Sequence, residues 1–133
     1  MELEIDFNKM QGLAPAIVQD AANGEVLMLG FMNRETWQNT SSSGYVTFFS
    51  RTRSQLWTKG ETSGNRLKLV SAFTDCDRDT LLLQVEVEGA GVVCHEGTRS
   101  CFTKPLGMDA RAPKSANRRG VEEGKKCTPA VPA

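Results

Sequence analysis

Three cysteines, Cys76, Cys94 and Cys101, have the side chains best suited to chemistry in this sequence. Thiolates bind zinc well, and three protein ligands leave a fourth position for water, as in catalytic zinc sites. Water bound there ionises near neutral pH and becomes a nucleophile for an electrophilic carbon. The sequence contains no CxxC pair, so cysteines that serve as small buried apolar residues are the alternative.

A second cluster, Asp75, Asp77 and Asp79, surrounds the first of these cysteines. The carboxylates occupy alternate positions, so on an extended backbone they share one face and repel one another. Mg²⁺ prefers oxygen ligands and would neutralise the cluster, whereas a solvated polar turn is the alternative. In a regular strand Cys76 points away from the aspartates, so zinc and Mg²⁺ would lie on different faces unless the segment bends.

Cations and hydroxyls are concentrated in two further segments, SRTR at 50–53 and WTKGETSGN at 57–65. Such groups, together with flexible backbone donors, recognise phosphate and carboxylate. The order of residues is not that of a P-loop, so composition does not identify the anion, and an ordinary polar hairpin is the alternative. The only histidine, His95, directly follows Cys94, and imidazole can move protons near pH 7, although a lone histidine is often structural.

Short strands and one helix are the elements predicted to position these groups. Ala16–Asp20 and Val26–Met32 are apolar runs joined through Asn23-Gly24, which favours a type I′ turn and predicts a β-hairpin. Asn33 can cap a short helix over 34–39. Further strands are predicted from apolar and β-branched runs at 45–50, 55–59, 67–73 and 80–88. This pattern predicts an α+β fold, mainly antiparallel β with one short helix.

Length and charge indicate one folded domain followed by a tail. The chain has 133 residues, of which 39% are hydrophobic and 24% charged, as in ordinary globular proteins. Residues 1–102 carry 13 acids and 9 bases, whereas residues 103–133 carry 3 acids and 7 bases. Because hydrophobic periodicity ends after Phe102, we predict a domain over 1–107 and a flexible basic tail over 108–133, with Cys127 as a non-ligand thiol.

The sequence shows no membrane or secretion signal. No apolar run is long enough to cross a bilayer, and the start MELEIDF lacks the basic region of a secretory signal. We therefore expect a cytoplasmic location and no membrane partner.

Five motifs in order resemble the phosphoribosyl-AMP cyclohydrolase family. They are GLAPAIVQDAANGEVLMLGFMNRE at 12–35, SRTR at 50–53, LWTKGETSGN at 56–65, DCDRD at 75–79 and CHEGTRSCF at 94–102. The resemblance implies the third step of histidine biosynthesis, in which zinc-activated water attacks C6 of the N1-phosphoribosylated adenine and opens the N1–C6 bond. It leaves the basic tail unexplained.

The resemblance also implies metal ions and an assembly. The three cysteines would hold one zinc ion per subunit, and the three aspartates would hold Mg²⁺. The family further implies an intertwined homodimer in which each zinc site uses cysteines of both chains.

The substrate implied by the resemblance, phosphoribosyl-AMP, carries two phosphate groups. The side chains predicted to bind it are Arg51, Arg53, Lys59, Ser63, Asn65 and Arg99. His95 is the predicted proton shuttle, and Glu61 is the second candidate for that role.

Two other classes of protein compete with this interpretation. A zinc-ribbon-like module would use structural zinc, with His95 or Cys127 as a fourth ligand, and would bind nucleic acid through the basic tail. Because residues 1–102 are net negative, we expect no nucleic-acid partner. A purine or pyrimidine deaminase would carry the H-x-E and P-C-x-x-C signature, which is missing here.

Overall fold

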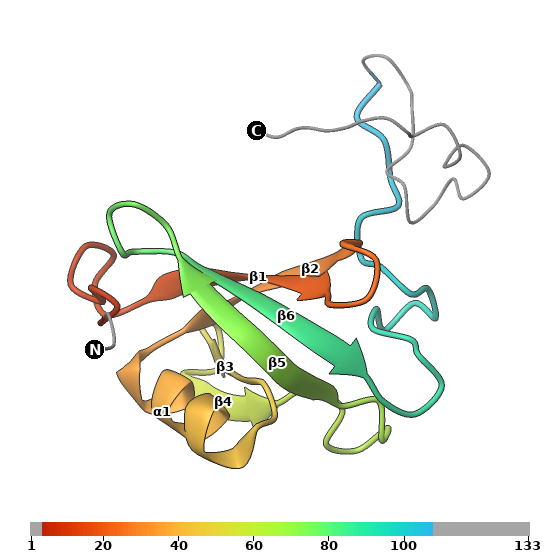
Figure 1. Cartoon of the computed structure of the whole chain (residues 1–133), viewed down its shortest axis with the longest axis horizontal. Helices are drawn as coiled ribbons and strands as arrows, with labels where there is room; N and C mark the ends of the chain where they lie inside the picture. Colours follow the sequence, from red (N-terminus) through yellow and green to blue (C-terminus); the bar gives the residue numbers. More distant parts are fainter. Residues whose placement is uncertain (1–3, 108–133) are drawn as a thin grey trace.

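The computed structural model describes residues 4–107, so the predicted tail with Cys127 lies outside the described residues. The elements in chain order are β1 (Ala14–Asp20), β2 (Val26–Met32), α1 (Arg34–Ser43), β3 (Thr47–Ser50), β4 (Gln55–Thr58), β5 (Leu67–Thr74) and β6 (Leu81–Val87). Four strands form a sheet in the order β2-β1-β6-β5, and β3 pairs with β4 in a separate hairpin. Figure 1 shows α1 and this hairpin together on one side of the larger sheet.

The strand pairings are mixed in direction. The pairs β1–β2, β3–β4 and β5–β6 are antiparallel, whereas β1 and β6 are parallel. The prediction of an α+β fold with mainly antiparallel strands and one short helix is therefore confirmed. The homodimer stays a prediction, because the structure contains one chain.

The β1–β2 hairpin forms where the sequence predicts it, but the predicted type I′ turn is wrong, because Gly24 has a positive φ of 80° and Asn23 does not. Along β1 every second residue is buried, from Ala14 through Val18 to Asp20, so one face of the strand points into the core. In the turn, the Asn23 side chain accepts a hydrogen bond from the N–H of Glu25 at 2.9 Å. Two acidic residues, Asp20 and Glu25, flank this turn at the end of the hairpin.

Helix α1 begins as predicted and extends past its predicted end. Asn33 caps it through a capping box, in which the side chains of Asn33 and Thr36 each accept the other's backbone N–H at 2.9 Å. The helix continues to Ser43 and is capped by Gly44, which adopts φ 83° and whose N–H donates to the Thr40 carbonyl. This left-handed cap, which glycine accommodates without strain, marks the end of the helix.

The core lies between the larger sheet and the layer formed by α1 and the β3–β4 hairpin. Phe48 on β3 is fully buried, and a Cβ atom at Gly30 on β2 would lie 2.6 Å from its ring. The Phe48 ring also packs on Trp57 of β4, with centroids 5.1 Å apart. Because Gly30 has no side chain, the β3–β4 hairpin can approach β2 closely. Trp57 of this hairpin remains partly exposed.

Two predicted strand boundaries differ from the structure. The third predicted strand begins at residue 45, but β3 starts at Thr47 because Tyr45 instead bridges to Lys68 of β5. The remaining strands agree to within one residue at each end, apart from β1, which starts at Ala14. Within residues 4–107, no helix is long and apolar enough to cross a membrane.

Candidate functional site

The turn between β5 and β6 brings three predicted metal ligands together. Carboxylate oxygens of Asp75, Asp77 and Asp79 lie within 4.8 Å of one another, and the chain bends at Arg78, where φ is 62°. The Asp75 carboxylate accepts hydrogen bonds from the N–H groups of Asp79 at 3.0 Å and Thr80 at 3.3 Å. Desolvation acts to raise the pKa of Asp75, but these hydrogen bonds outweigh it and lower the pKa. The all-oxygen donor set suits a hard cation such as Mg²⁺.

Two other groups contact this turn. The ammonium of Lys9 donates to the carbonyl of Asp77 at 2.9 Å and lies 3.6 Å from the Asp79 carboxylate. The thiol of Cys76 donates to the Asp77 carboxylate at 3.3 Å, and this hydrogen bond raises the pKa of Cys76. Without a metal, the exposed Cys76 thiol therefore holds its proton more tightly than an ordinary cysteine.

The other two predicted zinc ligands, Cys94 and Cys101, lie together on the segment after β6. Each thiol shifts the pKa of the other, and the N–H of Cys101 donates to the carbonyl of Leu27 on β2 at 2.8 Å. The N–H of Glu96 points at the buried Cys94 sulfur, 3.5 Å away, and lowers the pKa of Cys94. The Cys101 residue as a whole is exposed, yet desolvation of its thiol and the contact with Cys94 raise its pKa to about 11. Cys94 is therefore the thiol of the pair that ionises more readily.

Cys76 lies at the opposite end of the sheet from this pair. The aspartate turn precedes β6 and the Cys94–Cys101 segment follows it, so the strand separates them (Figure 1). The seven residues of β6, at about 3.3 Å per residue, put roughly 20 Å between the two loops. Zinc–sulfur bonds are about 2.3 Å long, so thiolates on one ion lie within about 5 Å of one another. Among residues 4–107, the three thiols do not form one group that could hold a metal ion, whereas the three aspartates do.

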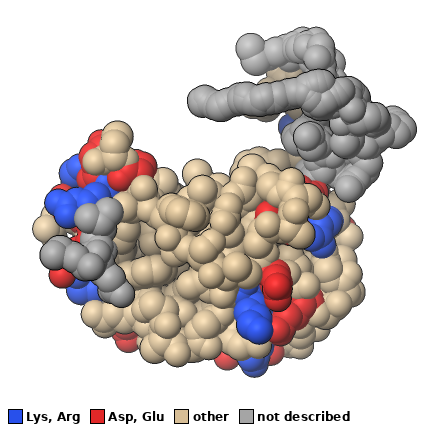
Figure 2. All heavy atoms as spheres, in the orientation of Figure 1, with Lys and Arg blue, Asp and Glu red and all other residues tan. Residues whose placement is uncertain are grey.

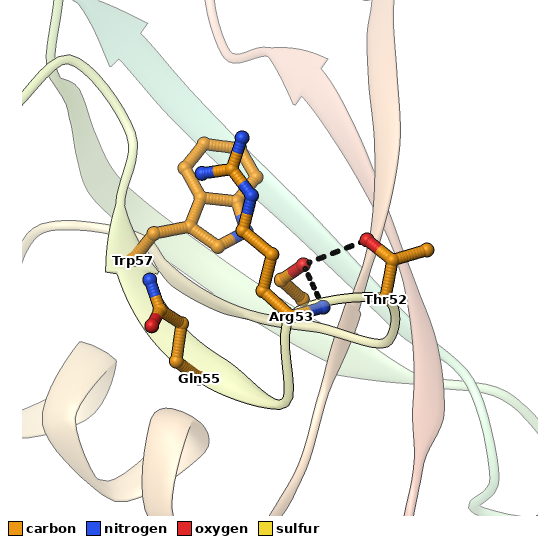
Figure 3. Close-up of a pocket in the computed structure, with 5 residues that line it drawn as sticks. Thr52, Arg53, Gln55 and Trp57 are labelled. Carbon is orange, nitrogen blue, oxygen red and sulfur yellow. Dashed lines mark hydrogen bonds between the residues drawn. The ribbon is translucent and has the colours of Figure 1, made fainter.

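The β3–β4 hairpin forms a polar pocket of about 390 Å³. Its lining residues are Ser50, Thr52, Arg53, Gln55 and Trp57. The Ser50 hydroxyl accepts the N–H of Arg53 at 3.2 Å and contacts the Thr52 hydroxyl at 3.4 Å. Figure 3 shows the Arg53 and Trp57 side chains extending to the same side of the hairpin. The pocket thus offers a guanidinium, hydroxyls and an aromatic face.

Two of the three other predicted cations, Arg51 and Lys59, lie near this pocket. Arg51 stacks over the ring of Phe31 on β2, with its guanidinium carbon 4.1 Å from the ring centroid. The ammonium of Lys59 lies 5.8 Å from the centre of the Trp57 ring. The charge of Lys59 favours the Cys101 thiolate and offsets part of the rise in the pKa of that thiol. Lys59 therefore connects the cationic hairpin with the cysteine pair.

The remaining predicted residues lie on the loops that follow β4 and β6. His95 directly follows Cys94, and Glu61 lies in the turn after β4; both are exposed. The Ser63 hydroxyl accepts the N–H of Asn65 at 3.1 Å, and the Asn65 side-chain oxygen accepts the N–H of Ala90 at 2.8 Å. The structure thus places Asn65 against the turn that leads to the cysteine pair, and the roles of all four residues stay predictions.

Arg99 contacts two buried acids that are not among the predicted site residues. Its Nε donates to Glu25 at 3.0 Å, its Nη2 forms an ion pair with Asp20, and its Nη1 donates to the carbonyl of Gly91 at 2.9 Å. Asp20 and Glu25 are only 6% and 7% exposed. The sequence signal for them is an acid on each side of the Asn23-Gly24 turn, but their partner is far away in sequence. Arg99 is predicted to bind the substrate, but its guanidinium already binds two carboxylates and a backbone carbonyl.

Comparison with known proteins identifies similar sequences. The profile of one family, described as phosphoribosyl-AMP cyclohydrolase, matches residues 28–103. The chain is 57% identical over 102 residues to the phosphoribosyl-AMP cyclohydrolase of Desulfatibacillum aliphaticivorans, which covers 77% of this chain and 81% of that protein. Its identity to the phosphoribosyl-AMP cyclohydrolase of Solibacter usitatus is 50% over 104 residues, or 78% of this chain and 82% of that protein.

Longer relatives also match. The chain is 58% identical over 100 residues to the histidine biosynthesis bifunctional protein HisIE of Bacteroides thetaiotaomicron, covering 75% of this chain and 48% of that protein. The chain thus spans about half the length of this bifunctional relative.

Proposed function

The chain belongs to the phosphoribosyl-AMP cyclohydrolase family, and from this premise we propose that it hydrolyses the adenine ring of phosphoribosyl-AMP in histidine biosynthesis. Water adds at C6 and the N1–C6 bond breaks. The observation that carries the proposal is that the Cys94–Cys101 segment and the cationic hairpin both contact β2, the first through Leu27 and the second through Phe31. The pair suits a metal that activates water, and the hairpin suits a substrate with two phosphate groups.

The hairpin residues are proposed to bind the phosphates and the base. Arg53 and the hydroxyls around it offer charged and neutral donors in one pocket, as phosphate recognition requires. Arg51 and Lys59 add positive charge on either side, and Trp57 presents a ring on which a purine can stack. Ser63 and Asn65 on the following turn are further proposed ligands.

Zinc is proposed to bind the three cysteines. The donor set fits, because thiolates are preferred zinc ligands and the amide of Glu96 already favours the thiolate of Cys94. When bound, zinc supplies a water that loses its proton near neutral pH. Ring opening then requires a proton at N1, which stays attached through C2 and becomes the N–H of an amidine. His95, next to Cys94, is the proposed shuttle, and Glu61 is the second candidate.

Each zinc site is proposed to draw on two chains of a homodimer. The separation of roughly 20 Å along β6 keeps Cys76 from the pair within one chain. A two-fold dimer would allow Cys76 of one chain to meet Cys94 and Cys101 of its partner, and would form two equal sites. The turn bends at Arg78, and the Cys76 thiol lies 3.3 Å from an Asp77 carboxylate oxygen, which supports a site that Cys76 and the proposed Mg²⁺ ligands reach together.

Apolar surface supports the proposal of a second copy. β5 is an edge strand, and its Val70 and Phe73 side chains are 53% and 54% exposed. Phe73 also lines an apolar groove of about 490 Å³ that includes Trp37 of α1 and Ile5. Figure 2 shows that charged side chains gather toward the margins of this view of the protein, and its middle is mostly uncharged. Exposed apolar area of this kind is typical of protein interfaces.

Mg²⁺ is proposed to bind the aspartate turn. The oxygens of Asp75, Asp77 and Asp79 lie close enough to share one ion, and a cation there would relieve their mutual repulsion. Lys9 supplies part of this positive charge when no metal is bound. A magnesium ion next to Cys76 would neutralise the negative charge of a substrate phosphate bound at the shared site.

A turnover assay tests the proposed function. Phosphoribosyl-AMP is incubated with the purified protein, and the ultraviolet spectrum is followed, because opening the purine ring changes the chromophore. The spectrum is expected to change, to stop changing after chelation, and to change again when zinc is returned. The matched control is Lys104→Gln, which alters an exposed ion pair on the same segment and is expected to retain turnover. A constant spectrum with zinc-loaded, dimeric protein would refute the proposal.

A further inference from the structure

Arg99 lies between the two cysteines in sequence and holds their segment at three points. Its guanidinium bridges Asp20 and Glu25 on the β1–β2 hairpin and donates back to the carbonyl of Gly91 at 2.9 Å. Gly91 precedes Cys94, so one side chain ties the start of the segment to its end and fixes both to the hairpin.

Neighbouring hydrogen bonds fix the same segment to β2. The hydroxyl of Ser100, which is 2% exposed, donates to the carbonyl of Val26 at 2.8 Å, and the N–H of Cys101 donates to Leu27. Within the segment, the N–H of Cys94 donates to the carbonyl of Thr98 at 3.0 Å. The positions of both thiols are therefore set by contacts that converge on residues 98–101.

The charges of this cluster do not balance. Two buried carboxylates share one guanidinium, and the second oxygen of Glu25 is buried with no hydrogen-bond partner among the described residues. Buried ion pairs lose much of their Coulombic gain to desolvation, so they stabilise folds weakly compared with apolar packing. Such clusters can instead fix a specific geometry, and the geometry that Arg99 controls is that of the cysteine segment.

We propose that Arg99 is a positioning residue, which uses Asp20 and Glu25 as anchors to hold Cys94 and Cys101 at the spacing that zinc binding needs. The proposal rests on the zinc site of the proposed function. A planar guanidinium can bond two carboxylates and a carbonyl at once, whereas an ammonium has no such fork. The identity of the side chain, and not its charge alone, is therefore what sets the geometry.

The test compares zinc affinity in Arg99→Lys, Lys104→Gln and wild-type dimers. Lysine keeps the positive charge next to the buried acids, so the variant retains a counter-charge for them. Lys104→Gln is the matched control, because it removes a cation that pairs with Glu96 at 2.8 Å on the same segment but in solvent. Zinc affinity is measured by competition with a chromophoric chelator at fixed protein concentration, and the melting temperature of each zinc-free protein is measured in parallel.

Arg99→Lys is expected to bind zinc about 10- to 100-fold more weakly, which is the usual loss when a residue that orients metal ligands is changed. The control is expected to match wild type. If Arg99→Lys does not fold, Glu25→Gln takes its place, because it weakens one anchor without leaving an unpaired charge, and a weaker zinc affinity is again expected.

Three results would overturn the proposal. Unchanged zinc affinity with a raised KM for phosphoribosyl-AMP would make Arg99 a substrate ligand. Unchanged zinc affinity with only a lower melting temperature would make the cluster a structural feature. A wild-type dimer that binds no zinc would remove the site that Arg99 is said to position. If zinc affinity falls as expected but wild-type protein opens no purine ring, the proposed function fails and the positioning role stands.

Discussion

Two inactive variants, Cys76→Ala and Cys101→Ala, are expected to restore activity when they are refolded together. Each variant alone lacks one thiol in both sites of its dimer. In the mixed dimer, one site combines Cys76 from one chain with Cys94 and Cys101 from the other, so all three thiols are intact. The second site lacks two thiols.

The size of the recovery follows from the separation of the thiols in one chain. Strand β6 separates Cys76 from the pair by roughly 20 Å within one chain, so in the proposed shared site only exchange between chains restores all three thiols. Random mixing makes half of the dimers mixed, each with one of two sites intact, so roughly a quarter of wild-type activity is expected for two-fold closure.

The assay is the ultraviolet turnover assay, with dimer formation verified by native mass spectrometry. A mixture of Cys94→Ala and Cys101→Ala is the matched control. These residues lie on the same segment, so every site in their mixed dimer lacks a thiol and no activity is expected. No recovery from the first mixture despite verified mixed dimers, or equal recovery from both mixtures, would refute the shared site.

Three further changes test individual parts of the structure. Asn33→Ala removes the capping-box acceptor for Thr36 and is expected to lower the free energy of unfolding by about 1 kcal/mol in urea denaturation; no loss would contradict the cap. Gly30→Ala places a Cβ atom 2.6 Å from the Phe48 ring and is expected to cost about 1–3 kcal/mol by the same measurement, whereas unchanged stability would mean that the ring moves freely. Asp77→Asn removes one carboxylate of the turn and is expected to raise the Mg²⁺ concentration for half-maximal turnover while zinc content stays the same. An unaltered Mg²⁺ titration would show that the turn holds no functional ion.

Elements with local signals were predictable from the sequence. The Asn23-Gly24 turn and the Asn33 cap act over a few residues, and the β1–β2 hairpin and the start of α1 follow from them. The end of α1 was predicted too early because its last turn is polar, although Gly44 supplied a signal for the cap. The clustering of the three aspartates also followed from their spacing, and the bend at the turn then brought them closer together.

Contacts between distant segments could not be predicted in this way. The parallel pairing of β1 with β6 joins Ala16 to Leu81, and no local pattern specifies that register. The same applies to the cluster of Arg99 with Asp20 and Glu25, whose members are 79 and 74 residues from the arginine. Apolar periodicity identifies buried faces, but it does not reveal which acid in a buried face has a distant cation as its partner.

Turnover in water labelled with a heavy oxygen isotope tests the proposed reaction most directly. Addition of water at C6 and cleavage of the N1–C6 bond predict a product heavier than phosphoribosyl-AMP by one labelled water, with the heavy oxygen in the new carboxamide group and the former exocyclic nitrogen retained as its amide. Mass spectrometry of the product and of its fragments reads both features. A product that carries heavy oxygen at C6 but has lost this nitrogen as ammonia would contradict ring opening and would identify a deaminase instead.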